Sequence, residues 1–132
     1  MGWLWKDWLN YFRPMSDPFI YLQFIRQYLG TLPGTSEGIC YGTPGFYVQK
    51  KLLARLWENG VVLVVHSEDR DKWMRDNPVI FFITDHYRNY PYVLVNLDKV
   101  DPEELKKLLT ESWLQRASKT LVKEYNSRKE VN

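Results

Sequence analysis

Residues 32–47 read LPGTSEGICYGTPGFY, and residues 81–95 read FFITDHYRNYPYVLV. In both stretches, Gly and Pro interrupt short runs of aromatic and β-branched residues. Such runs favour β-strands, whereas Gly and Pro favour the turns that join them. The two stretches therefore predict antiparallel strand pairs joined by shaped hairpins.

The rest of the chain adds helices before, between and after these strands. Apolar residues at helical spacing, with capping residues at their ends, predict helices at 18–29, 67–76, 101–113 and 118–125. Aromatic and β-branched runs predict strands at 37–41, 46–48, 52–57, 61–66, 79–84 and 92–97. This order predicts an α+β domain of two layers, in which helices pack on one side of an antiparallel sheet.

Asn59-Gly60 is a strong hairpin signal between two of these strands. Both residues tolerate the positive φ that a type I′ turn requires at its two central positions. We therefore expect a type I′ turn at Asn59-Gly60 and a longer loop over residues 42–45.

The chain of 132 residues is within the usual size of one domain. We expect residues 1–15 to form an amphipathic aromatic helix, residues 16–126 to form a single domain, and residues 127–132 to form a flexible tail.

Aromatic side chains lie on one face of the predicted N-terminal helix, among them Trp5, Trp8 and Phe12. This face favours packing on the domain or self-association with a second copy, and the alternative is an interfacial membrane anchor. No apolar run reaches the roughly 18 residues that a membrane span needs.

The charges of the chain nearly cancel. It contains 18 Lys and Arg and 16 Asp and Glu, which gives a net charge of +2. Nucleic-acid binding would therefore need local clustering of basic residues, because the whole protein has no strong positive electrostatic field. The single cysteine, Cys40, cannot form a disulfide within the chain, which favours a reducing compartment. We expect the protein to be cytoplasmic.

Residues dispersed from 17 to 125 match the pattern of one family: Leu32-Pro33-Gly34, Glu37-Gly38, Tyr41-Gly42-Thr43-Pro44, His86-Tyr87 and Tyr90-Pro91-Tyr92. They resemble the YjbR/MmcQ-like family of small bacterial proteins. The resemblance implies a secretion-chaperone-like (YjbR-like) α+β fold and a DNA-binding role through paired hairpin wings, and it implies no catalytic residues. The chain departs from the family pattern at Ser118, where a proline is expected, and in the aromatic segment before Asp17.

Basic residues form two candidate sets for phosphate contacts. The hairpin set is Lys50, Lys51, Arg55 and Arg88, and the helical set is Arg116, Lys119 and Lys123. Three- and four-residue spacing would place the helical set in one basic stripe. These residues predict a non-enzymatic module with weak, sequence-independent DNA binding through hairpin wings. The alternatives are ordinary solvated charge, a protein-interaction or chaperone-like module, or a small-ligand binder.

The small-ligand alternative rests on the aromatic loop from His86 to Tyr92. His86 and Tyr90, with Tyr41 and Trp73 nearby, would line a pocket for a planar ligand or an unpaired base. The other interpretation is a ring-packed loop with no ligand. Two histidines and one cysteine at distant positions do not make a zinc site, and no nucleophile and base share a motif. We therefore expect the protein to have no enzymatic activity and to bind no metal and no cofactor.

Overall fold

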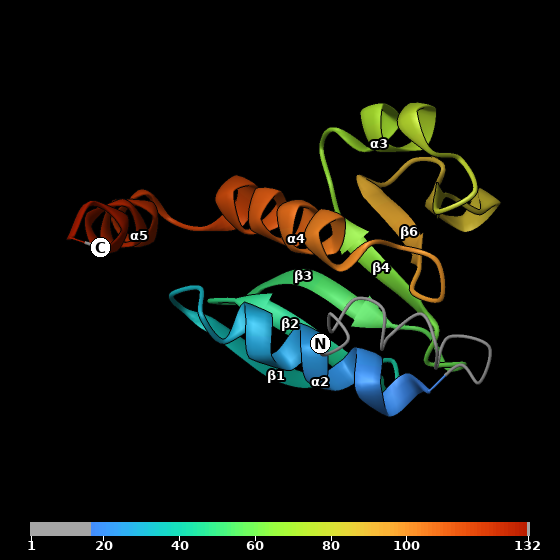
Figure 1. The fold of residues 1–132 in the computed structure, drawn as a ribbon, viewed down its shortest axis with the longest axis horizontal. Coiled ribbons are helices and arrows are strands. Elements are labelled where there is room, and N and C mark those ends of the chain that lie inside the picture. The colour runs from blue at the N-terminus through green and yellow to red at the C-terminus, as the bar shows by residue number, and fades with distance from the viewer. Residues whose placement is uncertain (1–16, 132) are drawn as a thin grey trace, which may run out of the picture.

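The structure is a computed structural model that describes residues 17–131. The predicted N-terminal helix, with the self-association residues Trp5, Trp8 and Phe12, lies outside the described residues. The labels below are those of Figure 1. The elements are α2 (Pro18–Leu29), β1 (Thr35–Cys40), β2 (Thr43–Val48), β3 (Lys51–Leu56), β4 (Val62–His66), α3 (Arg70–Asp76), β5 (Phe81–Phe82), the 3-10 helix η2 (Asp85–Tyr87), β6 (Tyr92–Asn96), α4 (Pro102–Arg116) and α5 (Lys119–Val131).

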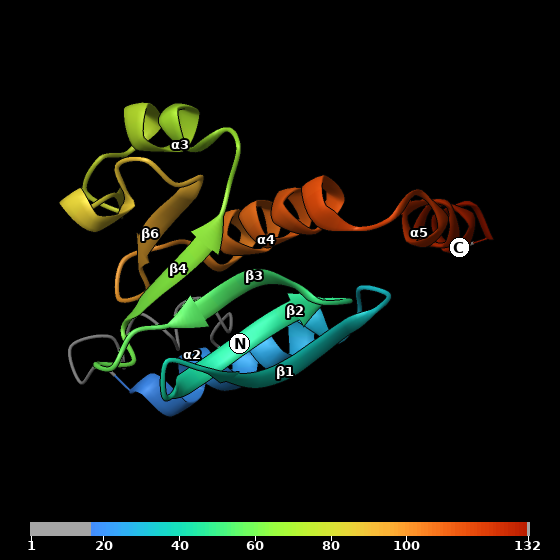
Figure 2. The ribbon, with the colours of Figure 1, turned by 180° about the vertical axis from the view of Figure 1, so that it is seen from behind.

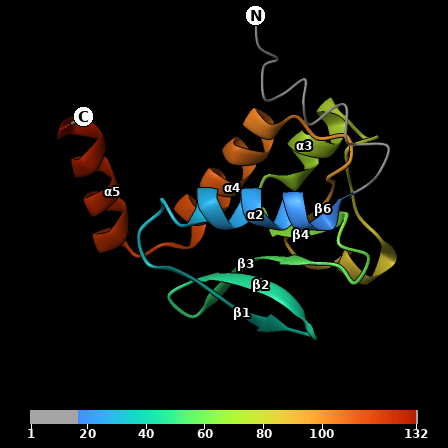
Figure 3. The same ribbon diagram turned by 60° about the horizontal axis from the view of Figure 1, so that its bottom comes forward.

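One antiparallel sheet organises the fold, with the strand order β1-β2-β3-β4-β6-β5. Helices α2 and α4 lie on one side of its strands (Figures 1 and 3). Ile25 of α2 and Leu108 of α4 are fully buried there against Leu53, Leu63 and Val95. Fully burying each such side chain contributes about 1.5–3 kcal/mol. The predicted α+β class, with helices on one side of the sheet, is confirmed.

A two-residue hairpin turn lies at Tyr41-Gly42, not at Asn59-Gly60. These two residues have φ of 52° and 79°, and they join the paired residues Cys40 and Thr43. Positive φ at both central positions is the signature of a type I′ turn.

The predicted loop over residues 42–45 is therefore too long, because Thr43, Pro44 and Gly45 belong to β2. Proline is tolerated at this place in the strand. The pairing of β2 with β3 ends at Gly45 and Arg55, so Pro44 has no β3 partner that would need its missing N–H.

The prediction of a type I′ turn at Asn59-Gly60 is wrong. Gly60 has φ of 74°, whereas Asn59 is not among the residues with positive φ. Instead, the Gly60 N–H donates to the Trp57 carbonyl at 2.9 Å, and the Asn59 side chain accepts from the Val61 N–H at 3.0 Å. Because the Trp57 N–H donates to the Val62 carbonyl at 2.9 Å, four residues connect the two strands, and connections of this length are most often built around a type I turn.

Gly60 also lies close to the start of α2. A Cβ at this position would be 2.5 Å from the Pro18 Cβ, in addition to the unfavourable φ. We expect Gly60→Ala to lower the free energy of unfolding by about 2–3 kcal/mol, measured by urea denaturation. Gly42→Ala is the matched control, because its φ is 79° but nothing lies within 4 Å of its Cβ. An equal loss in both variants would contradict the role of the Pro18 contact.

Two predicted elements are shorter than expected. The strand predicted over 79–84 pairs only at Phe81 and Phe82. The helix predicted from Ser67 begins at Arg70, because Ser67 N–H instead donates to the Pro91 carbonyl at 2.8 Å. Ser67 therefore joins β4 to the loop before β6 rather than capping a helix.

A break at Ala117 and Ser118 separates the last two helices. Ala117 is extended, with ψ of 148°, and the Ser118 hydroxyl accepts from the Leu121 N–H at 3.2 Å. Serine thus caps α5 in the place where a proline was expected. Helix α5 continues to Val131, so residues 127–131 of the predicted tail are helical.

Candidate functional site

The sheet face turned away from α2 and α4 carries a hollow lined by rings (Figure 2 views the sheet from this side). It forms where the β1–β2 turn, the strands β3, β4 and β6, and the loop around η2 meet. The hollow has a volume of about 290 Å³. We call it the aromatic cup, and its lining residues are Tyr41, Leu52, Arg55, Val64, His86, Tyr87, Tyr90 and Tyr92.

Ring contacts build one wall of the aromatic cup. The His86 ring meets Tyr87 edge to face at 4.7 Å between centroids and lies 6.2 Å from Tyr90. Tyr87 in turn lies 6.0 Å from Tyr92. Tyr41 and Tyr90 stay 85% and 56% exposed. The wall is therefore packed at its base, with ring surface exposed at its rim.

Arg55 brings a positive charge into the cup. Its guanidinium donates to the Tyr87 hydroxyl at 3.3 Å and to the Leu56 carbonyl at 3.4 Å, and both partners are neutral. Within residues 17–131, no carboxylate lies within 4.0 Å of Arg55. Burial raises the pKa of the Tyr92 phenol, which keeps this neighbour uncharged. The half-buried cation can therefore accept an anionic group.

Arg70 holds the loop that forms the wall. Its Nη1 donates to the carbonyls of Tyr87 at 2.6 Å, of Tyr92 at 3.0 Å and of Tyr90, and its Nη2 donates to the Arg88 carbonyl at 2.7 Å. One guanidinium thus ties together four carbonyls of the loop over 87–92.

Arg70 was not among the predicted site residues. The sequence shows only a cation in the first turn of the helix predicted over 67–76, where the helix dipole disfavours it, and nothing that indicates its backbone partners.

Of the predicted pocket residues, Tyr41, His86 and Tyr90 come together in the cup, but Trp73 does not. Trp73 is buried in the main core, 5.0 Å from the Phe81 ring, and its Nε1 donates to Glu111 at 3.0 Å. Its helix turns this side chain towards α4 and away from the open face of the sheet. The placement of Trp73 in the pocket is therefore wrong.

The predicted hairpin set of basic residues is divided. Lys50 and Lys51 are exposed at the β2–β3 turn, whereas Arg55 is about 13 Å further along β3, in the cup. Arg88 is exposed but pairs with Asp85 at 2.7 Å. Within this set, only Lys50 and Lys51 are therefore adjacent to each other and both exposed.

The predicted stripe through Arg116, Lys119 and Lys123 is wrong, because the break at Ala117 and Ser118 places Arg116 on α4 and both lysines on α5. Arg116 is half-buried, and its charge acts on the buried ring of His66. Burial lowers the pKa of His66 and Arg116 lowers it further, against the opposing effect of Glu68 at 3.1 Å. Arg116 therefore does not present its charge on one surface with the two lysines.

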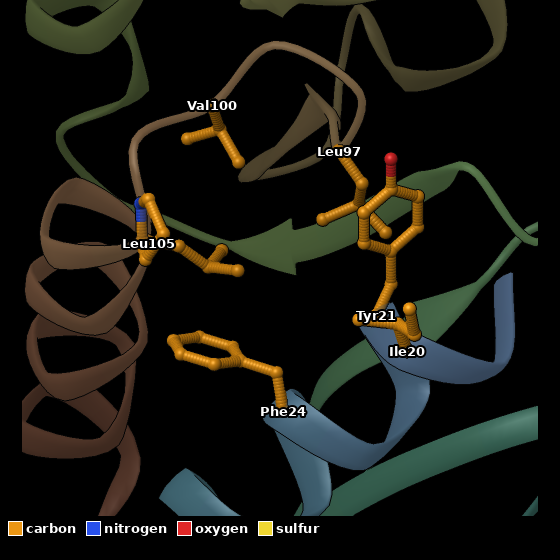
Figure 4. A pocket seen from close by; sticks show the side chains of 7 residues that line it. Ile20, Tyr21, Phe24, Leu97, Val100 and Leu105 are labelled. Atoms are coloured by element: carbon orange, nitrogen blue, oxygen red, sulfur yellow. The ribbon is translucent and has the colours of Figure 1, made fainter. Parts of the chain in front are cut away.

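A second hollow lies between α2, α4 and the end of β6. Figure 4 shows Tyr21 and Phe24 of α2 reaching towards Leu97 and Leu105. Its volume is only about 30 Å³ and its lining is apolar. This is close to the share of liquid volume of one water molecule, so the hollow is a packing gap and not a ligand site.

The described part of the chain shows neither a grouping of metal-binding side chains nor a helix fit to cross a membrane. No group of three His, Cys, Asp or Glu side chains there could hold a metal ion. None of the helices from α2 to α5 has the length and apolar character that crossing a bilayer requires.

The fold and the cup define a small α+β protein with a ring-lined hollow on the open face of its sheet. A family model described as YjbR matches residues 30–115. The chain belongs to the YjbR family, as its residue pattern indicated.

The similar proteins bear on fold more than on function. Uncharacterised proteins of Mycobacterium tuberculosis and Mycobacterium bovis are 42% identical over 50 residues, which is 38% of this chain and 39% of each relative. The match therefore spans well under half the length of these relatives. The crystal structure of the Deinococcus radiodurans protein DR2400, with a DUF419 domain, gives a TM-score of 0.61 at 23% identity over 76% of this chain and 83% of that one. This likeness shows the shared fold.

Proposed function

We propose that this YjbR-family protein is a non-enzymatic binding module and that the aromatic cup is its binding site for a planar ligand. The observation that carries the proposal is the convergence of exposed rings around Arg55, whose partners are neutral. Concave sites with ring surface and a few polar groups are the usual form of small-molecule sites.

The lining of the cup supports binding rather than catalysis. It contains no serine, cysteine or carboxylate, and within residues 17–131 no hydrogen bond joins His86 to a tyrosine hydroxyl of the cup, so no nucleophile there is paired with a base. Its one histidine, His86, packs edge to face against Tyr87 and lies tilted beside Tyr90. The cup can therefore stack against the planar ring of a ligand, hydrogen-bond the edge of that ring and attract a negative charge on the ligand.

We also propose a cytoplasmic location. Cys40 is the only cysteine of the chain, and it lies half-buried on the edge strand β1. A partly exposed, unpaired thiol is best preserved in a reducing compartment.

Truncating the rim of the cup tests the site. We expect Tyr90→Ala to weaken the binding of a planar probe, adenosine 5′-monophosphate, by roughly tenfold, because stacking on one aromatic side chain contributes about 1–3 kcal/mol. Isothermal titration calorimetry measures the change. Phe19→Ala is the control, since Phe19 is a 65% exposed ring on α2, outside the cup. Equal affinity in both variants would refute the cup as the site.

Weak DNA binding through the hairpin wing is the second candidate function. The exposure of the adjacent Lys50 and Lys51 at the β2–β3 turn favours it, because such a turn can reach a phosphate backbone. The other predicted basic residues lie on different elements, so few of them can contact phosphates at the same time. Any such binding is therefore weak and independent of sequence.

Changing both Lys50 and Lys51 to alanine tests this candidate. We expect affinity for two unrelated duplexes to fall equally, with a salt slope shallower by up to about two units. Fluorescence anisotropy at several salt concentrations gives the slope. A double change of the exposed Lys99 and Lys107 to alanine removes the same charge elsewhere and is the control. If the wild-type protein binds neither duplex at low salt, this candidate fails.

A further inference from the structure

Tyr41 occupies a position that disfavours its side chain. Its φ is 52°, in the first central position of the type I′ turn, where Asn, Asp and Gly are favoured. A bulky side chain in this left-handed region is sterically unfavourable. Because 85% of Tyr41 is exposed, packing does not compensate for this strain. Strained residues of this kind cluster at functional sites.

The strained tyrosine stands beside the cation of the cup. The Arg55 guanidinium carbon lies 5.4 Å from the centroid of the Tyr41 ring, within the range of a cation–π contact. Its two hydrogen-bond acceptors, the Tyr87 hydroxyl and the Leu56 carbonyl, leave its positive charge uncompensated. A ligand that stacks on Tyr41 would therefore have an anion-binding group directly next to its ring.

The wall of the cup provides a second ring surface. His86 and Tyr90 lie with their ring planes tilted by 31°, and both line the same hollow as Tyr41. The volume of about 290 Å³ is near the lower end of small-molecule sites. One planar ring with one attached anionic group fits a hollow of this size.

We propose that the aromatic cup binds a nucleotide unit, with the base stacked on Tyr41 and the phosphate held by Arg55. This inference rests on the cup being the binding site, as proposed above. A free mononucleotide and an unpaired nucleotide of a single strand share this chemistry. Stacking of a base would give Tyr41 a role at a position where asparagine would fit the backbone better.

The chain offers a matched pair of variants to test this. Gln49 is the other non-glycine residue with positive φ among residues 17–131, at 58°, and it lies outside the cup. Asparagine tolerates this backbone region, so we expect Tyr41→Asn and Gln49→Asn each to raise the melting temperature by about 2–4 °C. Only Tyr41→Asn should weaken adenosine 5′-monophosphate binding, by roughly tenfold.

Arg55→Gln tests the phosphate contact. The wild-type protein should prefer adenosine 5′-monophosphate to neutral adenosine by roughly tenfold, and Arg55→Gln should remove that preference. Calorimetry with the oligonucleotide dT8 separates the two sources of the ligand. Tighter binding of dT8 than of the mononucleotide identifies a single strand, and the reverse order identifies a free nucleotide.

Three outcomes would overturn the inference. If Tyr41→Asn binds the mononucleotide as tightly as the wild type, or if neither the mononucleotide nor dT8 binds, the nucleotide assignment is wrong. The Tyr90→Ala variant shows whether the broader proposal survives. Equal binding of adenosine and its monophosphate, weakened in both cases by Tyr90→Ala, would keep the cup as a site and reject the phosphate contact.

Discussion

Replacing Trp113 with alanine is expected to lower the free energy of unfolding by about 4 kcal/mol, because large-to-small changes of a buried aromatic residue leave a cavity. Trp113 is fully buried. Its Nε1 donates to the Pro33 carbonyl at 2.9 Å, and its ring lies 5.1 Å from Tyr125 of α5. One side chain thus joins α4, the turn before β1 and α5.

Urea denaturation measures this loss. Trp113→Phe keeps most of the packing but leaves the Pro33 carbonyl without its donor, so we expect a smaller loss of about 2 kcal/mol. Leu114→Ala is the control, because the neighbouring Leu114 is 43% exposed. If Trp113→Ala and Leu114→Ala have the same midpoint, Trp113 does not organise this part of the core.

Replacing Arg70 with alanine should act on the cup as well as on stability. The change removes hydrogen bonds from a charged donor to four carbonyls of the loop over 87–92. We expect a loss of about 2–3 kcal/mol in the free energy of unfolding and at least roughly tenfold weaker binding of a planar probe. Arg70→Lys should not restore either property, because an ammonium group lacks the planar fork of donors.

Arg75→Ala is the matched control for Arg70, since it removes the same charge from an exposed position of α3. Amide hydrogen exchange of residues 87–92 separates a local effect from a global one. Exchange in this loop should accelerate in Arg70→Ala more than in the core strand β4. Unchanged exchange in the loop would contradict the role of Arg70 in positioning the cup.

The strands and the α+β class could be predicted from the sequence because each depends on local pattern. The hairpin types could not. Asn59-Gly60 has the stronger local preference for a type I′ turn, but four residues separate Trp57 from Val62 there, and only Gly60 takes positive φ. Tyr41-Gly42 takes the type I′ turn because the pairing of Cys40 with Thr43 leaves two residues to join them.

The candidate site could be predicted in part. The aromatic loop indicated His86 and Tyr90, and the structure places Tyr41 beside them. Trp73 was misplaced because a short helix gives little information about which face is buried. Arg55 was assigned to a basic wing because sequence shows its charge but not the rings around it. Arg70 was missed because its partners are backbone carbonyls, which leave no residue pattern.

The most direct test of the central claim, that the aromatic cup is the binding site, is a ¹H–¹⁵N correlation spectrum of the full chain titrated with adenosine 5′-monophosphate. We expect the shifted amides to be those of Tyr41 and Gly42, of β3 around Arg55, and of the loop over 86–92. Shifts concentrated instead around Lys50 and Lys51 or along α5, or no shifts at saturating probe, would contradict it.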